Sequence, residues 1–284
     1  MPLIPRRINL RTVLVGLGTT ALILGRLATT NADPDLWGYL AFGRQFFTNG
    51  FPFSDPFAYT PTQSTWVYHE WLTGVLFYGI YHYTGSAGLQ LFKYTIGLLT
   101  ALLVYLAARR RGASRPAAVM GILLISPVFN IGYSPVRAQV FTNLFLTLTI
   151  LILEGCRHEG RFRRLVFLPA VMVVWANLHG GFLAGWGIMV LYTLTVMATE
   201  RSGIYFALAT LASLLVTLVN PYGLDYWTYL IQAVTMPRPE IDEWHSLFSA
   251  LTNGEYLWNQ YYFIVFTLLT VLAVFSRKID DWPA

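Results

Sequence analysis

Long apolar stretches separated by short polar interruptions run through almost the whole chain. A bilayer crossing takes about 20 helical residues, and eight stretches are apolar over a similar or slightly shorter length. They cover residues 12–31, 88–108, 116–133, 138–154, 165–178, 182–199, 203–219 and 258–276. The pattern predicts an all-α polytopic membrane protein with about eight transmembrane helices. It also predicts that the first apolar run is a retained span and not a cleaved signal peptide.

Two further apolar stretches do not fit one crossing each. Residues 70–83 are aromatic and only about fourteen residues long, a length that suits a helix lying in the membrane interface. Residues 165–199 are too long for a single span. Polar and helix-breaking residues cluster at 177–181, so we expect the chain to turn back there.

The distribution of basic residues sets the predicted orientation. Cytoplasmic loops are enriched in Lys and Arg. In this layout fourteen basic residues fall on one side, namely Arg6, Arg7, Arg11, Arg109, Arg110, Arg111, Arg115, Arg157, Arg161, Arg163, Arg164, Arg201, Arg277 and Lys278. Only Arg44, Arg137 and Arg238 fall in loops on the other side. We therefore expect both termini in the cytoplasm.

The opposite, outer side carries the two long loops. Residues 31–87 form the first, with interfacial helices, and residues 220–257 form the second. Both are rich in aromatic residues, and nine of the fourteen acidic residues lie on this side. No internal repeat is visible, so we expect residues 1–284 to form a single transmembrane domain with any chemistry on its outer face.

Composition narrows the function classes. The chain is 55% hydrophobic and 12% charged, with a mean hydropathy of +0.52, whereas soluble domains carry about 25% charged residues. A single cysteine, Cys156, rules out an internal disulfide and is read as an inert thiol. No phosphate-binding loop, dinucleotide fingerprint or CxxC pair supports ATP, NAD or thiol redox chemistry. The basic loops follow topology, so no nucleic-acid partner is expected.

Two carboxylates, Asp33 and Asp35, flank Pro34 just beyond the first span. Pro34 fits the first turn of a new helix with Asp33 as its N-cap, and this reading is purely structural. Alternatively, the two carboxylates bind a divalent cation or act as a general base. Arg26 lies seven residues before Asp33, two helical turns back, and either pairs with it or extends toward the headgroups.

Histidine and glutamate are adjacent at His69 and Glu70, within an aromatic segment. Together with Asp33 or Asp35, the histidine would supply the ligands for a cation such as Mg²⁺ or Mn²⁺. The alternative is local hydrogen bonding at the headgroup level. Asn177 and His179 at the predicted break either satisfy the exposed backbone there or line an outward-facing cavity.

Two cations on the outer side are candidates for binding phosphate. Arg137 lies in a short loop and Lys93 near the outer end of a predicted span. A guanidinium matches the geometry of a phosphate group. Either side chain could instead extend to the bulk headgroups.

Six short segments, in order along the chain, resemble one family of membrane enzymes. They are DPDLWGYL (33–40), SDPFAYT (54–60), WVYHEWL (66–72), WANLHGGFL (175–183), NPYG (220–223) and IDEW (241–244). These segments resemble a bacterial branch of the GT-C superfamily, which includes protein O-mannosyltransferases and lipid A aminoarabinose transferases. The match departs at Gly38 and Tyr39, where the branch has Trp-His, and no second outer acid lies near Arg137. The branch is also usually longer at its C-terminus.

The resemblance implies a glycosyltransferase of the bacterial inner membrane that uses a polyprenyl-phosphate-linked sugar. Asp33 would be the general base, Asp35, His69 and Glu70 would position the acceptor or a cation, and Arg137 and Lys93 would hold the phosphate. Membrane lipids and a membrane protein partner are the other expected contacts. Two alternatives stay open, a catalytically silent scaffold of a membrane complex and a lipid or solute transporter with its site at the 177–181 break.

Overall fold

The structure, a computed structural model, describes residues 10–60, 66–133, 136–237, 264–265 and 267–268. Every regular element among these residues is a helix, which confirms the all-α class. The chain divides into two compact units, Met1–Tyr229 and Leu230–Ala284. Three predicted features lie wholly or mainly outside the described residues. They are the IDEW segment, the second outer loop beyond residue 237 and most of the predicted eighth span.

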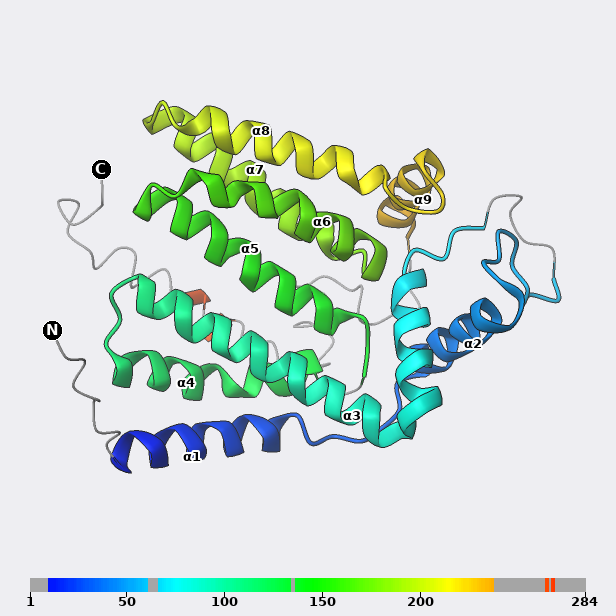
Figure 1. Cartoon of the computed structure of the whole chain (residues 1–284), viewed down its shortest axis with the longest axis horizontal. Helices are drawn as coiled ribbons and strands as arrows, with labels where there is room; N and C mark the ends of the chain where they lie inside the picture. The colour runs from blue at the N-terminus through cyan, green and yellow to red at the C-terminus, as the bar shows by residue number, and fades with distance from the viewer. Residues whose placement is uncertain (1–9, 61–65, 134–135, 238–263, 266, 269–284) are drawn as a thin grey trace, which may run out of the picture. The chain divides into compact units, whose positions relative to one another are not determined.

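The helices follow the predicted apolar stretches closely (Figure 1). In chain order they are α1 (Leu10–Arg26), α2 (Pro34–Asn49), α3 (Trp71–Arg110), α4 (Arg115–Tyr133), α5 (Gln139–Glu159), η1 (Phe162–Val166), α6 (Phe167–Leu178), α7 (Phe182–Thr199), α8 (Gly203–Leu215), η2 (Val216–Leu218) and α9 (Leu224–Thr235). Each predicted span between residues 12 and 219 therefore coincides largely with a helix, although the first, 12–31, extends beyond the end of α1 at Arg26.

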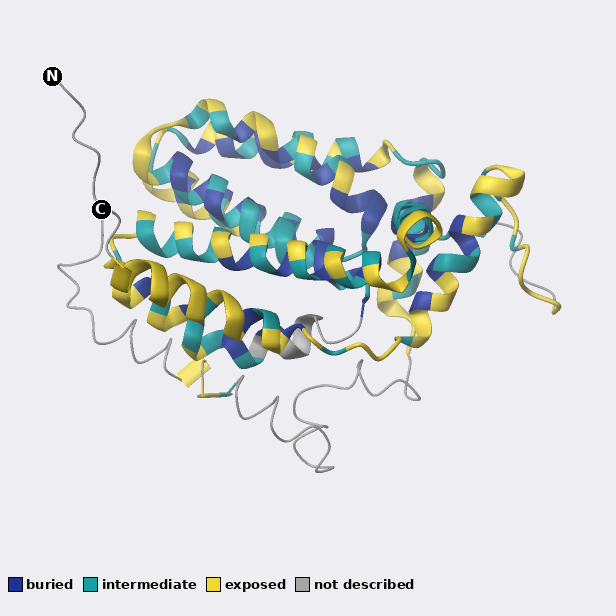
Figure 2. Ribbon diagram, turned by 60° about the horizontal axis from the view of Figure 1, so that its bottom comes forward, coloured by how far each residue is buried: buried dark blue, intermediate teal, exposed yellow. Residues whose placement is uncertain are grey.

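Three of these helices, α3, α5 and α7, are long and apolar enough to cross a membrane. Two shorter apolar helices cover Arg115–Pro127 and Gly203–Leu218. Large apolar side chains such as Leu191, Leu194 and Leu208 are more than half exposed on α7 and α8. Figure 2 shows exposed positions along the outward faces of the helices and buried positions between them. Apolar surface of this kind indicates a membrane protein.

The helix α3 consists of two pieces that meet at Gly85. This residue has φ 66° and ψ −164°, a conformation open to glycine but not to residues with a side chain. The first piece corresponds to the predicted interfacial helix, and the second to the predicted span at 88–108. Figure 1 shows the change of direction between them. The break predicted at 177–181 is also present, because α6 ends at Leu178 and α7 begins at Phe182.

The helix α3 packs on α2, α4 and α5, and its first piece meets α2 at a very short distance. Glycines on both helices allow the α2 contact. A Cβ atom on Gly43 would lie 2.3 Å from the carbonyl oxygen of Gly74, and one on Gly74 would lie 3.1 Å from the carbonyl oxygen of Tyr39. This crossing fixes α2 against the start of α3, where the candidate site lies.

We expect Gly43→Ala to lower the free energy of unfolding by about 1–3 kcal/mol, because the added methyl group must push the two backbones apart. Thermal unfolding of the purified protein in detergent measures the effect. Gly79→Ala is the matched control, since its Cβ would lie 3.9 Å from Phe47 and alanine favours the helix. Equal unfolding temperatures for the two variants would contradict the close crossing.

Candidate functional site

Polar residues from four segments meet at one place in the first unit. The segments are the start of α2, the start of α3, the residues just before α5, and the break between α6 and α7. Arg137, before α5, contacts Asp35 in α2, and His179, in the break, lies beside Glu70 at the start of α3. Three of the segments singled out by their resemblance therefore converge in space, although they are far apart in the sequence.

The two aspartates at the start of α2 share one arginine. Asp33 is the N-cap of α2 with Pro34 at its first position, as predicted, and its Oδ1 accepts a hydrogen bond of 2.9 Å from the backbone N–H of Asp35. Arg137 Nη2 donates to Asp35 Oδ2 over 2.7 Å, and Arg137 Nε lies 3.4 Å from Asp33 Oδ1. Asp33 thus acts both as a cap and as half of a carboxylate pair that holds a guanidinium.

Glu70, directly before α3, is the carboxylate at the centre of the cluster. The Tyr39 hydroxyl donates to its Oε2 over 2.7 Å. Its Oε1 lies 3.3 Å from His179 Nε2 and 3.7 Å from His69 Nε2. The ring of His69 packs on that of Tyr229, whose hydroxyl lies 3.0 Å from His69 Nδ1. One acidic side chain is therefore surrounded by a phenol and two imidazoles.

The hydrogen bonds of His179 define its tautomer. The backbone N–H of Gly181 donates to His179 Nδ1 over 2.9 Å, so this nitrogen is an acceptor. In a neutral imidazole the proton then lies on Nε2, the atom that faces Glu70. Thr142 Oγ1 lies 2.7 Å from the same Nδ1 and accepts from Trp175 Nε1 over 3.1 Å. A Cβ on Gly181 would lie 2.1 Å from Thr142 Oγ1, so this arrangement requires glycine.

Burial and neighbouring charges shift the titration of these groups. The pKa of Glu70 is raised to about 7, chiefly by burial and to a lesser extent by the charge of Asp35. The Tyr39 hydrogen bond and the charge of Arg137 act in the opposite direction. Burial, with His69 and Arg137 nearby, lowers the pKa of His179 to about 4, which keeps its imidazole neutral. Burial and Glu70 raise the pKa of Tyr39, so its hydroxyl keeps its proton.

Comparison with known proteins adds no family assignment. Neither the protein-family models nor the curated proteins nor the solved structures gave a match to this chain. The site is therefore interpreted from its own geometry.

The three residues predicted to hold a cation are not brought together as a ligand set. Asp33 and Asp35 face Arg137, and His69 lies beside Glu70 and Tyr229. Over the described part of the chain, no group of three or more His, Cys, Asp or Glu side chains is arranged to hold a metal ion. A cation at this place stays a prediction from the sequence.

Asn177 makes hydrogen bonds of the kind that the first of its two readings predicts, and it also lines a pocket. Its Nδ2 donates to the carbonyl oxygens of Val173 and Val219 over 2.8 and 2.9 Å, and its Oδ1 accepts from Trp71 Nε1 over 2.7 Å. It thus joins α6, the start of α3 and the segment after η2. The pocket has a volume of about 440 Å³ and is lined mainly by apolar groups, and its other lining residues are Trp71, Leu72, Val173, Val174, Val219, Asn220 and Pro221.

Arg26 and Lys93, two cations singled out in the sequence, have other surroundings than those predicted. The predicted helical register between Arg26 and Asp33 is wrong, because α1 ends at Arg26 and α2 begins only at Pro34. Arg26 is exposed at that end. Lys93 is fully buried in α3, and its Nζ donates to the carbonyl oxygen of Thr29 over 2.6 Å. Lys93 therefore fixes the linker between α1 and α2.

Sequence reasoning missed Tyr39 and Thr142. Tyr39 stands where the resembling branch has histidine, so the sequence alone marks it only as a missing ligand. A tyrosine on the buried face of a helix normally needs a hydrogen-bond partner, and this was the available signal. Thr142 lies within an apolar run, and nothing in the sequence distinguishes it from other helix threonines.

Proposed function

We propose that this protein is a membrane glycosyltransferase that takes a sugar from a polyprenyl-phosphate donor, with Glu70 as its general base. The observation that carries the proposal is the largely buried Glu70 carboxylate, which contacts Tyr39 and His179 and has a pKa raised to about 7. Resemblance to GT-C enzymes supports the choice of donor, because the segments that carry the resemblance supply most of the cluster.

Glu70 suits the base role better than Asp33, to which the resemblance points. A base works best when its pKa lies near the working pH, since it is then both deprotonated and basic. Asp33 is occupied by the cap of α2 and by Arg137. In the proposed reaction Glu70 takes the proton of an acceptor hydroxyl as that oxygen attacks the anomeric carbon. The bond from this carbon to the phosphate oxygen breaks, and polyprenyl phosphate leaves.

Arg137 would contact the phosphate of the leaving group, and the apolar pocket lined by Asn177 would hold its polyprenyl chain. A guanidinium stabilises the charge that develops on a departing phosphate. The pocket of about 440 Å³ has the apolar lining that a polyprenyl chain requires. The donor would reach both from the membrane, so no soluble nucleotide-sugar site is needed.

A scaffold of a membrane complex is the second candidate. The observation that favours it is the internal pairing of the charges, because Asp33 and Asp35 both contact Arg137. In a scaffold this cluster would hold α2, α3 and α5 together and would have no catalytic part.

The first test is a direct assay of turnover. The purified full-length protein is supplied with a broad pool of polyprenyl-phosphate sugars and acceptors, and released polyprenyl phosphate is measured for the wild type and for Asp33→Asn. This variant keeps the oxygen that caps α2 but removes one charge facing Arg137. We expect the wild type to turn over and the variant to lose about tenfold, the effect of weakening one charge-assisted contact.

Two outcomes would change the assignment. An absence of turnover by the wild type across the whole pool would favour the scaffold. Complete loss in Asp33→Asn, with unfolding temperature unchanged, would return the role of base to Asp33.

A further inference from the structure

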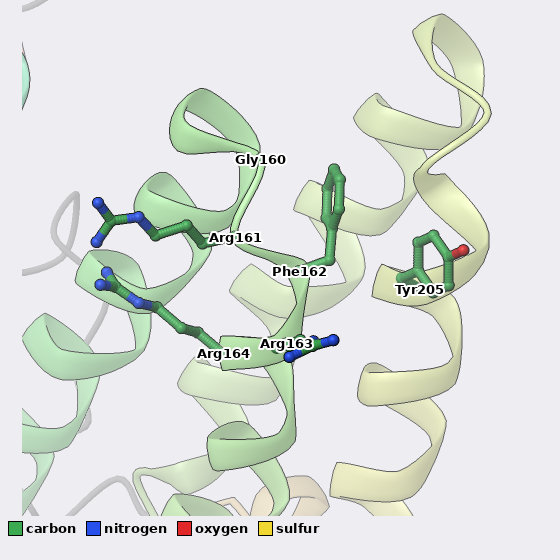
Figure 3. Close-up of a pocket in the computed structure, with 6 residues that line it drawn as sticks. All are labelled: Gly160, Arg161, Phe162, Arg163, Arg164 and Tyr205. Carbon is green, nitrogen blue, oxygen red and sulfur yellow. The ribbon is translucent and has the colours of Figure 1, made fainter.

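A second polar feature lies at the opposite end of α5, on the side predicted to face the cytoplasm. The helix ends at Glu159, Gly160 adopts a left-handed conformation with φ 65°, and the short helix η1 follows. A pocket of about 670 Å³ opens here and is lined by Gly160, Arg161, Phe162, Arg163, Arg164 and Tyr205 (Figure 3). We refer to it as the arginine pocket.

The arginine pocket carries excess positive charge. Arg161 Nε lies 3.1 Å and Arg164 Nη1 3.7 Å from the same oxygen of Glu159, and Arg110 lies 3.7 Å from its other oxygen. One carboxylate thus faces three guanidinium groups. Arg163 is exposed and forms no ion pair with the carboxylates of the described residues. Figure 3 shows Arg163 extending toward Tyr205, away from Arg161 and Arg164.

An aromatic surface borders these charges. The rings of Phe162 and Tyr205 stack with centroids 5.6 Å apart, and Phe162 also contacts Phe206 edge-on. Shortly after the pocket residues in the chain come exposed apolar side chains, namely Val166 at the end of η1, Phe167 at the start of α6 and Leu208 on α8. Positively charged, aromatic and exposed apolar side chains therefore lie close together in the chain, in the segment from Arg161 to Phe167 and at the start of α8.

This sequence of surfaces matches the parts of a phospholipid. Basic pockets at the cytoplasmic ends of membrane helices attract anionic headgroups, and aromatic rings favour the level of the interface. The exposed apolar side chains would contact the acyl chains. A free phosphate or a nucleotide has no acyl chain that could contact these exposed apolar side chains.

We propose that the arginine pocket binds the phosphate of an anionic phospholipid headgroup, with Arg163 as its main contact and the Phe162–Tyr205 surface beside the glycerol region. This site is separate from the Glu70 cluster and does not depend on the proposed glycosyl transfer. It would tie the loop between α5 and α6 to the membrane surface.

The test compares lipids by their effect on thermal unfolding of the full-length protein in a neutral detergent. Short-chain phosphatidylglycerol, short-chain phosphatidylcholine and glycerol 3-phosphate are titrated separately. A ligand that binds only the folded state raises the unfolding temperature with its concentration. We expect a saturable rise with phosphatidylglycerol that neither of the other two compounds reproduces.

The variants are Arg163→Gln and, as matched control, Arg115→Gln. Both remove one exposed arginine from the predicted cytoplasmic side and have the same net charge. We expect Arg163→Gln to weaken the binding of phosphatidylglycerol about fivefold, the effect of one basic group near a lipid surface. We expect Arg115→Gln to leave this binding unchanged. Equal weakening by both variants, or an equal response to phosphatidylcholine, would overturn the site. An equal response to glycerol 3-phosphate would show a phosphate site that is not specific for lipid.

Discussion

Glu70→Gln is expected to lower turnover about 10²–10⁴-fold, the range for loss of a general base. Glutamine is nearly the same size and keeps one oxygen for the hydrogen bond from Tyr39, so the packing at the start of α3 should survive. What the variant loses is the ability to take a proton. Released polyprenyl phosphate is measured at saturating donor, and the unfolding temperature is recorded alongside.

Glu154→Gln provides the matched control for that measurement. Glu154, in α5, also accepts a hydrogen bond from a tyrosine, Tyr192, and pairs with Arg111 over 3.1 Å. Glu154 lies near the C-terminal end of α5, whereas Arg137 lies just before its N-terminal end. Turnover in Glu154→Gln should equal that of the wild type. An unchanged rate in Glu70→Gln would exclude Glu70 as the base.

The pH dependence of the wild type should report the same group. Because the pKa of Glu70 is raised to about 7, the carboxylate gains its basic form as pH rises through that value, and turnover should rise with it. The effect on stability has the opposite sign. The folded state holds this proton more tightly than the unfolded chain, so Glu70 stabilises the fold below pH 4.5 and loses that contribution as pH rises to about 7.

Arg137→Gln is expected to reduce turnover about 10²–10³-fold, as when a preorganised cationic or hydrogen-bonding group at a developing charge is removed. Arg137→Lys should recover only part of this, because an ammonium keeps the charge but not the forked geometry that contacts Asp33 and Asp35. Turnover and the concentration dependence on the donor are measured for both variants.

Arg44→Gln is the control for the arginine variants, since Arg44 is exposed on α2 and also lies on the predicted outer side. It should behave as the wild type. If Arg137→Gln lowers the unfolding temperature but turns over normally, Arg137 only holds the two aspartates, and the proposed contact with phosphate is wrong.

Much of the fold follows from the apolar pattern. The spacing of apolar runs and arginine clusters predicts where most helices begin and end, and Pro34 and the polar residues at 177–181 predict two of the boundaries. The end of α1 at Arg26 was not predicted, because residues 27–30 are as compatible with a helix as those before them. The close crossing at Gly43 and Gly74 was not predicted either, since nothing in a single sequence shows that two glycines face one another.

The candidate site was only partly predictable for the same reason. Asp33, Asp35, Glu70, His179 and Arg137 stand out as polar residues beside apolar runs. Their pairing does not, because it depends on which helices pack together. Sequence reasoning placed His69 with the aspartates, whereas the structure places it beside Glu70 and Tyr229. The sequence predicts Lys93 near phosphate, but its Nζ donates to the backbone carbonyl oxygen of Thr29.

The separation of these partners along the chain has a consequence for biosynthesis. Tyr39 and Glu70 are 31 residues apart and can pair as soon as α2 meets the first piece of α3. Asp35 can pair with Arg137 only after a further 102 residues have been synthesised. His179 can contact Glu70 only after α6 has been made. A nascent chain that ends before Arg137 therefore carries its aspartates without their arginine. The hydrogen bonds and ion pairs of this cluster can therefore form only in the order in which their residues are synthesised.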